Sequence, residues 1–227
     1  MNIEHVFFDL DHTLWDFERN SALTLKKIFL ESKIEVKFDD FITTYIPINA
    51  NYWKLYREEK VSKRNLRYGR LKETFDAINY TIEDSKINFL SEEYINQLPN
   101  FNYLFEGTLE ILEYLKKKYQ LHIITNGFEE IQALKMEKSG ILSFFNEVIT
   151  SESVGVKKPN PRVFEFALKK ANARAEKSIM IGDNLEADIQ GALNSGIHAL
   201  HFNSENTTNI PKNIPSVNHL LEIKQYL

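Results

Sequence analysis

The sequence predicts an α/β fold in which helices cover both faces of a parallel sheet in three layers, with an all-helical segment inserted after the first strand. Short runs of β-branched and aromatic residues alternate along most of the chain with amphipathic stretches of helical length. This alternation is typical of parallel strands joined by right-handed crossovers. One long stretch near the N-terminus has helical periodicity and no strand-like run, which predicts the insertion.

Five runs are expected to be strands, and the first of them, IEHVFFDL, ends in an acidic residue. Each later run follows an amphipathic stretch, and two of these stretches end in Gly, as helices often do. The expected strands cover residues 3–10, 120–127, 146–153, 177–184 and 198–203. The expected helices before the last four strands cover residues 108–119, 128–140, 161–172 and 185–196.

The all-helical segment is too long to be a loop, so it predicts a small separate domain inserted into the sheet domain. We therefore expect a catalytic core made of residues 1–16 and 101–227, and an inserted helical domain of residues 17–100 that lies over the active edge of the sheet. Within the insertion, helices are expected at residues 18–33, 38–45, 49–60, 62–78 and 91–98.

Composition limits the kinds of partner. The 227 residues carry a formal net charge of −4, which gives no global field that would attract a nucleic acid polymer or an anionic membrane. There is no Cys, so disulfides, thiolate metal sites and cysteine nucleophiles are excluded. The first residues lack a cationic leader and a long apolar run, and we expect a cytoplasmic protein.

Two carboxylates, Asp9 and Asp11, stand two positions apart at the end of the first strand-like run. Buried carboxylates without partners are costly, and two close together repel each other. A calcium loop of the EF-hand type is excluded, because Thr13, Leu14 and Asn20 occupy positions that require Asp or Asn, Gly and Glu. A turn or helix cap formed by Asp11 and Thr13 stays open as a structural alternative.

A second acidic site follows another buried run, in the stretch GDNLEAD. Asp183 comes directly after Gly182, and Asp188 lies five residues further on, where it could also complement a helix dipole. Because parallel strands end at the same edge of a sheet, Asp9, Asp11 and Asp183 are expected to meet there. Clustered carboxylates need a cation, and hard oxygen ligands favour Mg²⁺.

Two further strand ends supply groups that bind anions. Lys157 and Lys158 precede Pro159 in the stretch VGVKKPNP, and Thr125 and Asn126 begin the stretch TNG. Each is ordinary alone, since such lysines are usually solvated and such stretches are usually turns. Together with a metal they predict a phosphate clamp made of an ammonium group, a hydroxyl and backbone N–H groups.

Taken in order, these residues resemble the four signature motifs of the haloacid dehalogenase superfamily. The resemblance implies a Rossmann-like core, with Asp9 as the nucleophile and Asp11 as the general acid and base. It also implies that Thr125 and Lys158 bind the phosphoryl oxygens. The motifs are Asp9-x-Asp11-x-Thr13, Thr125 after a strand, Lys158 before Pro159, and Gly182-Asp183 with Asp188.

The resemblance also implies the metal ligands. Asp9 and Asp183 would bind Mg²⁺ through their side chains and Asp11 through its backbone carbonyl. Asp188 would orient these ligands without binding the metal itself. Members that are dehalogenases attack carbon and lack an acid two residues after the nucleophile. The presence of Asp11 therefore argues for phosphate ester chemistry.

The helical insertion matches the position of the superfamily's C1-type cap. IITNGF, VGVKKPN, the trio Asn49, Trp53 and Tyr56, and the pair Gly69-Arg70 resemble the bacterial house-cleaning pyrimidine 5′-nucleotidases. A nucleoside base needs a flat apolar surface and hydrogen-bond donors. Candidates for this surface are Trp53, Tyr56, Arg70 and Phe128, with Tyr52, Tyr68, Arg64, Arg67 and Gln132 as further possibilities.

These side chains could instead have a purely structural role. The aromatic residues and Gln132 would then pack between helices, and the arginines would lie on a solvated face. We therefore predict a Mg²⁺-dependent phosphohydrolase that forms an aspartyl-phosphate and acts on a pyrimidine nucleoside 5′-monophosphate. A phosphatase for sugar or other small organic phosphates is the alternative, and a binding protein without turnover is a third. A small phosphate ester is the expected partner, with a monomer or homodimer as the expected assembly.

Overall fold

The computed structural model describes residues 2–204, 206–208 and 210–227. The chain divides into two compact units, which we call the sheet unit and the helical unit. The sheet unit contains residues 1–17 and 102–227, and the helical unit contains residues 18–101. Each boundary lies one residue later than the sequence analysis places it.

The sheet unit is built on six parallel strands in the order β3-β2-β1-β4-β5-β6. The predicted α/β class with a parallel sheet is confirmed. The predicted strands are shorter in the structure, and β6 at the edge was not predicted. The strands are β1 (His5–Phe8), β2 (Gln120–Thr125), β3 (Glu147–Thr150), β4 (Ser178–Gly182), β5 (His198–Phe202) and β6 (Ser216–Val217).

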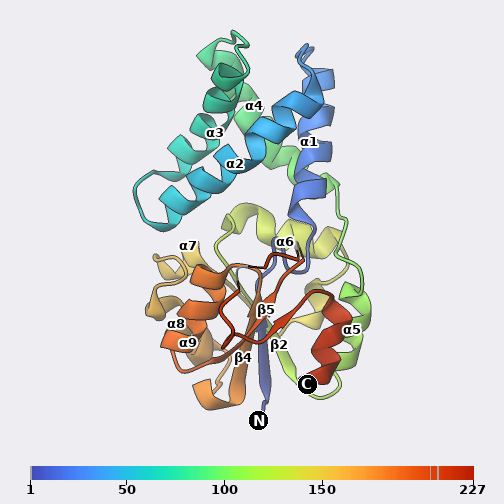
Figure 1. Ribbon diagram of the computed structural model, residues 1–227, viewed down its shortest axis with the longest axis vertical. Helices are drawn as coiled ribbons and strands as arrows, with labels where there is room; N and C mark the ends of the chain where they lie inside the picture. Colours follow the sequence, from blue (N-terminus) through green and yellow to red (C-terminus); the bar gives the residue numbers. More distant parts are fainter. Residues whose placement is uncertain (1, 205, 209) are drawn as a thin grey trace. The chain divides into compact units, whose positions relative to one another are not determined.

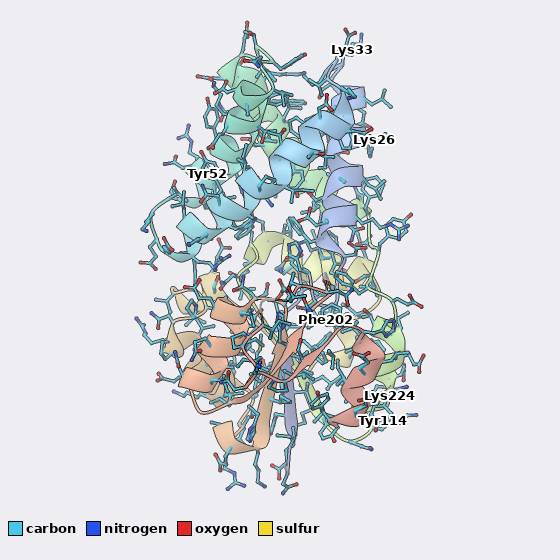
Figure 2. All side chains as sticks on the ribbon, viewed as in Figure 1. Lys26, Lys33, Tyr52, Tyr114, Phe202 and Lys224 are labelled. Carbon is cyan, nitrogen blue, oxygen red and sulfur yellow. The ribbon has the colours of Figure 1, made fainter. Side chains whose placement is uncertain are left out.

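Helices cover both faces of this sheet. In Figure 1, α8 (Pro161–Lys170) and α9 (Gly191–Asn194) lie on one side, and α5 (Thr108–Leu115) lies on the other. The last helical turns, η5 (Leu220–Gln225), pack beside α5, where Lys224 lies over the ring of Tyr114 at 5.4 Å from its centroid (Figure 2).

Apolar side chains from the strands and from α8 and α9 form one continuous core. Phe7, Ile124 and Met180 of the central strands meet Val163 and Phe164 of α8 there. All four residues of β1 are buried, as expected for a central strand covered on both faces. The remaining short elements are α6 (Glu129–Lys138), α7 (Ser151–Val154), η2 (Leu142–Phe144), η3 (Ala175–Lys177) and the π-helix η4 (Leu185–Gln190).

One predicted strand ends too late. Residues 151–153 were expected to continue the strand that starts near residue 146, but they form the short helix α7. The side-chain hydroxyl of Thr150 accepts a hydrogen bond from the backbone N–H of Ser153 at 3.2 Å. This cap ends β3 and begins the helix, because it satisfies a backbone donor that a continuing strand would pair with its neighbour.

The helical unit contains α2 (Phe38–Arg57), α3 (Lys63–Ala77), α4 (Asp84–Gln97), η1 (Leu98–Asn100) and all of α1 (Phe17–Glu31) except its first residue. Two helices were predicted where α2 runs unbroken through Pro47, and α4 begins seven residues before its predicted start. A proline inside a helix costs about 3 kcal/mol. Pro47 is exposed, while Phe41, Tyr45 and Asn49 are buried at four-residue spacing on the other face, so packing on both sides of the proline keeps the helix continuous.

Aromatic residues fill the interior of the helical unit. Phe29 of α1 meets Phe41 of α2 edge-on with ring centroids 4.7 Å apart, and Phe75 of α3 lies 5.1 Å from Phe41. Contacts between aromatic rings, such as the edge-to-face pair of Phe29 and Phe41, add to the stability gained by burial. Among the described residues, no helix combines the length and the apolar character that a membrane span requires.

Candidate active site

Three neighbouring strands bring polar side chains to one edge of the sheet. β1 lies between β2 and β4, and all three run parallel, so their carboxyl ends meet. Asp9 follows β1, Thr125 ends β2 and Asp183 follows β4. The chain moves from β1 outward through β2 and β3 and then returns to the other side of β1 as β4. Ligands of open α/β sheets bind at such a point of reversal.

Lys158 is the cation at the centre of this edge. Its buried Nζ donates to Oδ1 of Asp9, to Oδ1 of Asp188 and to the carbonyl oxygen of Ile124, each at 2.6 Å. These three contacts use all three donors of an ammonium group. Burial disfavours the charge of Lys158, but Asp188 and Asp9 outweigh burial and raise the pKa of Lys158 above that of an exposed lysine.

Asn126 holds the loop that carries Lys158. Its Nδ2 donates to the carbonyl oxygen of Lys158 at 3.0 Å, and its Oδ1 accepts from the backbone N–H of Lys158 at 2.9 Å. The side-chain amide thus joins the end of β2 to the lysine loop. Asn126 was predicted to bind phosphate, but in the structure its side chain binds the backbone of Lys158.

Asp188 lies deeper than the sequence indicated. It is buried, and besides the ion pair with Lys158 its Oδ2 accepts from the backbone N–H of Asn184 at 3.0 Å. A Cβ atom at Gly182 would lie 2.4 Å from this Oδ2. Glycine at position 182 therefore allows Asp188 to approach the end of β4, which explains the spacing in GDNLEAD.

Asp9, Asp183 and Asp188 place one carboxylate oxygen each within 4.8 Å of the others. Burial raises the pKa of Asp183 to about 7, and Asp188 adds to this effect. Burial also raises the pKa of Asp9 well above its ordinary value, although Lys158 opposes the rise. Burial is the main cause of both shifts, and the close carboxylates add to it, because Lys158 is the cation that Asp9 and Asp188 share. A divalent cation on these oxygen donors would restore the balance of charge, and the donor set fits Mg²⁺.

Asp11 belongs to a different group of contacts. Its Oδ1 lies 2.7 Å from Nζ of Lys135, and its Oδ2 accepts from Nε2 of Gln132 at 3.0 Å. Both partners belong to α6 and are buried. Lys135 was not predicted as a site residue, and Gln132 was predicted only as a substrate contact or a packing residue. The spacing of two polar residues three positions apart on α6 was the signal available.

Thr125 is arranged to donate a hydrogen bond. Its Oγ1 accepts from the backbone N–H of Gly127 at 3.0 Å and from Nε2 of Gln132 at 2.8 Å. A hydroxyl has two acceptor lone pairs and one hydrogen. Because both lone pairs are used, the hydrogen is what Thr125 can offer to a ligand, which suits a phosphoryl oxygen.

The main residues that were predicted to contact the substrate lie in the helical unit, except for Phe128, which lies in the sheet unit. Trp53 and Tyr56 of α2 meet edge-on with centroids 5.7 Å apart, and Tyr56 is buried. Arg70 is also buried; its Nη1 donates to Oδ1 of Asn49 at 3.0 Å and its guanidinium lies 4.6 Å from the ring centroid of Tyr94. Phe128, in the sheet unit, is buried before α6. A substrate role for these side chains stays a prediction.

Comparison with known proteins agrees with this arrangement. A family model for haloacid dehalogenase-like hydrolases matches residues 6–202. The chain belongs to this hydrolase family. The resemblance stated from the motifs is therefore confirmed, and so is the prediction of a hydrolase.

Similar proteins extend over the whole chain. Pyrimidine 5′-nucleotidase YjjG of Escherichia coli is 30% identical over 231 residues, covering 100% of this chain and 99% of its own. Glyceraldehyde 3-phosphate phosphatase of Methanothermobacter thermautotrophicus is 33% identical and covers 90% of this chain and 88% of its own. The crystal structure of the HAD-hydrolase YfnB from Bacillus subtilis, described as bound to magnesium, has a TM-score of 0.90 at 25% identity, with 100% and 99% of the two chains covered.

Proposed function

We propose that this protein is a Mg²⁺-dependent phosphohydrolase that forms a phosphoryl intermediate on Asp9 and acts on pyrimidine nucleoside 5′-monophosphates. The observation that carries this proposal is the contact of 2.6 Å between Nζ of Lys158 and Oδ1 of Asp9 at the switch point of the sheet. A buried carboxylate paired in this way is held in one orientation, as a nucleophile must be.

Each residue has one task in the reaction. Lys158 and the hydroxyl of Thr125 bind the phosphoryl oxygens and offset the charge that develops on them. An oxygen of Asp9 bonds to phosphorus while the bond to the ester oxygen breaks. Asp11 gives a proton to the departing alkoxide and then takes one from the water that hydrolyses the aspartyl-phosphate.

Mg²⁺, when bound, supplies positive charge that stabilises the phosphoryl group and the ionised form of Asp9. Asp9 and Asp183 would hold it through their side chains and Asp11 through its backbone carbonyl. Asp188 stands within reach of the same position, and we assign it to the support of Lys158 and of the ligands.

The choice of substrate rests on the relatives and on the composition of the helical unit. YjjG, which matches the chain from end to end, is named as a pyrimidine 5′-nucleotidase. Trp53 and Tyr56 of α2 are aromatic side chains of the kind that stacks on a base. The glyceraldehyde 3-phosphate phosphatase among the relatives makes a sugar phosphate the second candidate. A cytoplasmic location and a monomer or homodimer remain predictions from the sequence.

A substrate panel separates the two candidates. Purified protein in Mg²⁺ is assayed for phosphate release from UMP, dUMP, dTMP, purine nucleotides, phosphoglycolate, hexose phosphates and glyceraldehyde 3-phosphate. We expect the highest kcat/KM for a pyrimidine nucleotide. A preference for glyceraldehyde 3-phosphate would reject the nucleotidase assignment and keep the phosphohydrolase. Acid quenching followed by peptide mapping tests the intermediate, and label on any residue other than Asp9 would reject the mechanism.

A further inference from the structure

The carboxyl group of Asp11 is held at both oxygens by one face of α6. Lys135 contacts Oδ1 at 2.7 Å and Gln132 contacts Oδ2 at 3.0 Å. These two residues stand three positions apart, which places them on the same side of a helix. Both are at most 1% exposed. The orientation of Asp11 is thus fixed from the interior of the sheet unit.

Lys135 is unusual because a lysine is rarely fully buried. Its Nζ lies 4.4 Å from the ring centroid of Trp15 and 5.4 Å from that of Phe17. A lysine that served packing alone would extend its ammonium group to water. Here the ammonium points inward, to aromatic faces and to the carboxylate of Asp11, and these interactions offset the loss of hydration.

Gln132 connects Asp11 to the group that binds phosphate. Its Nε2 donates to Oδ2 of Asp11 at 3.0 Å and to Oγ1 of Thr125 at 2.8 Å, which uses both hydrogens of the amide. A Cβ atom at Gly127 would lie 2.2 Å from this Nε2, so glycine in the TNG turn makes room for the bridge. One side chain therefore sets the distance between the proton-transfer group and a phosphate-binding hydroxyl.

We propose that Lys135 and Gln132 are positioning residues for the reaction, which hold the carboxyl group of Asp11 in line with the leaving-group oxygen. This inference rests on the proposed function, because it assigns a task only if Asp11 transfers protons. A carboxylate has about four lone-pair sites. Two of these are occupied by Lys135 and Gln132, so a lone pair on each oxygen remains for the proton that passes to the ester oxygen and returns from water.

Two aryl phosphates of nearly equal size test the proposal. Phenyl phosphate needs a proton on its leaving oxygen, whereas para-nitrophenyl phosphate releases a stable anion and depends much less on a general acid. The value measured is the ratio of kcat/KM for phenyl phosphate to kcat/KM for para-nitrophenyl phosphate. We expect Lys135→Met to lower this ratio about 10-fold, within the roughly 10²–10⁴-fold that general acid catalysis contributes. Asp11→Asn gives the limiting value.

The controls distinguish positioning from a structural role. The ratio is measured within one sample, so a smaller folded fraction in a variant cancels. Lys135→Arg keeps the cation and is expected to restore most of the ratio. Lys138→Met makes the same substitution at an exposed position of α6 and is expected to leave the ratio unchanged. A ratio that stays at the wild-type value in both Lys135→Met and Gln132→Met would overturn the proposal.

A crystal structure of Lys135→Met tests the geometry without turnover. We expect the carboxyl group of Asp11 to leave the orientation in which Lys135 and Gln132 hold it, because Oδ1 has lost its partner, and an unchanged Asp11 would contradict the proposal. If the wild-type protein hydrolyses neither an aryl phosphate nor any member of the substrate panel, the proposed function fails, and the crystal structure still decides whether Lys135 orients Asp11. If Lys135→Met does not fold, Gln132→Met provides both measurements.

Discussion

Two polar clusters on the same sheet differ in their charge: one gathers carboxylates around an ammonium group, and the other is a pair of neutral histidines. At the carboxyl ends of the strands, three carboxylates face the single ammonium group of Lys158. Within β1 and β2, Nδ1 of His5 lies 3.1 Å from Nε2 of His122, and the two rings stack with centroids 5.3 Å apart. The histidine pair closes on itself as neutral rings, because burial lowers the pKa of His122 to about 4.

The acidic cluster lowers the stability of the folded protein, whereas the histidine pair does not. The neutral pair makes one hydrogen bond, and His122 packs against Phe7 at a centroid distance of 4.8 Å. Among the described residues Nδ1 of His122 has no hydrogen-bond partner, but an unpaired neutral nitrogen costs far less in a core than an unpaired charge. The acidic cluster keeps excess negative charge in a buried place, which favours the unfolded state until a cation binds. We infer that the histidine pair serves folding, whereas the acidic cluster is retained for its chemistry at the expense of stability.

Asp9→Asn is expected to separate these two roles most sharply. Removal of the proposed nucleophile should lower kcat for para-nitrophenyl phosphate by roughly 10⁴-fold or more, since catalytic residues that act as a unit have effects of this size. The unfolding free energy without divalent ion should stay equal or rise, because one carboxylate of the crowded cluster becomes neutral. Urea unfolding in EDTA measures it. A clear loss of stability would mean that the cluster stabilises the fold, and the comparison would fail.

Lys158→Met is expected to lower both activity and stability. It leaves Asp9 and Asp188 without their cation, and loss of one partner of a buried ion pair typically costs about 3–5 kcal/mol. Urea unfolding in EDTA measures the change. Lys157→Met, the neighbouring position in the same loop, is the matched control and should change stability by less than about 0.5 kcal/mol. Equal effects at the two positions would contradict the importance of the ion pairs.

Mg²⁺ is expected to stabilise the protein in a way that depends on pH. A ligand at 100 times its Kd stabilises by about 2.7 kcal/mol, which corresponds to roughly 5–10 °C in Tm for a chain of this size. The folded pKa of Asp183, about 7, lies above its ordinary value of 3.8. The folded protein therefore binds more protons between these values, and its stability without metal falls as pH rises through this range.

Thermal unfolding at pH 5.5 and pH 8, each with Mg²⁺ and with EDTA, tests this prediction. The stabilisation by Mg²⁺ should be larger at pH 8, because more of the cluster is ionised there. Asp183→Asn should reduce the difference between the two pH values. Equal stabilisation at both pH values in the wild-type protein would show that the acidic cluster does not bind the ion.

Much of the fold was predictable because its signals are local. The runs HVFF and SIMIG are buried strands, Asp9 and Asp183 follow them, and Thr125 ends the strand β2, so these three residues meet where the strand order predicts. Lys158 comes from the loop after α7. The two residues of β6 are too short to show periodicity. The continuity of α2 through Pro47 depends on buried contacts along its whole length, which local propensity does not reveal.

Lys135 illustrates what the sequence could not supply. A lysine within EEIQALKMEK is expected on a solvated face, and only the packing of α6 against Trp15 buries it beside Asp11. Gln132 was predicted as a substrate contact or a packing residue, but its two acceptors come from β2 and from the loop after β1. Contacts across more than a hundred residues depend on the register of helices and strands, which a single sequence does not fix.

The smallest effect expected concerns the histidine pair under acid. An unfolded histidine has a pKa near 6.5, whereas that of folded His122 is about 4, so the unfolded state binds more protons in between. The free energy of unfolding is therefore unaffected by this group above about pH 7 and decreases as the pH drops toward 4. At pH 5 the decrease due to His122 is about 1–2 kcal/mol after allowance for solvent screening. His122→Gln should remove that part of the loss.

Urea unfolding at pH 7.5 and pH 5 measures the loss of stability, with His198→Gln on β5 as the matched control. If His122→Gln loses as much stability as wild type between these pH values, the pair is not held as neutral rings and the contrast with the acidic cluster disappears.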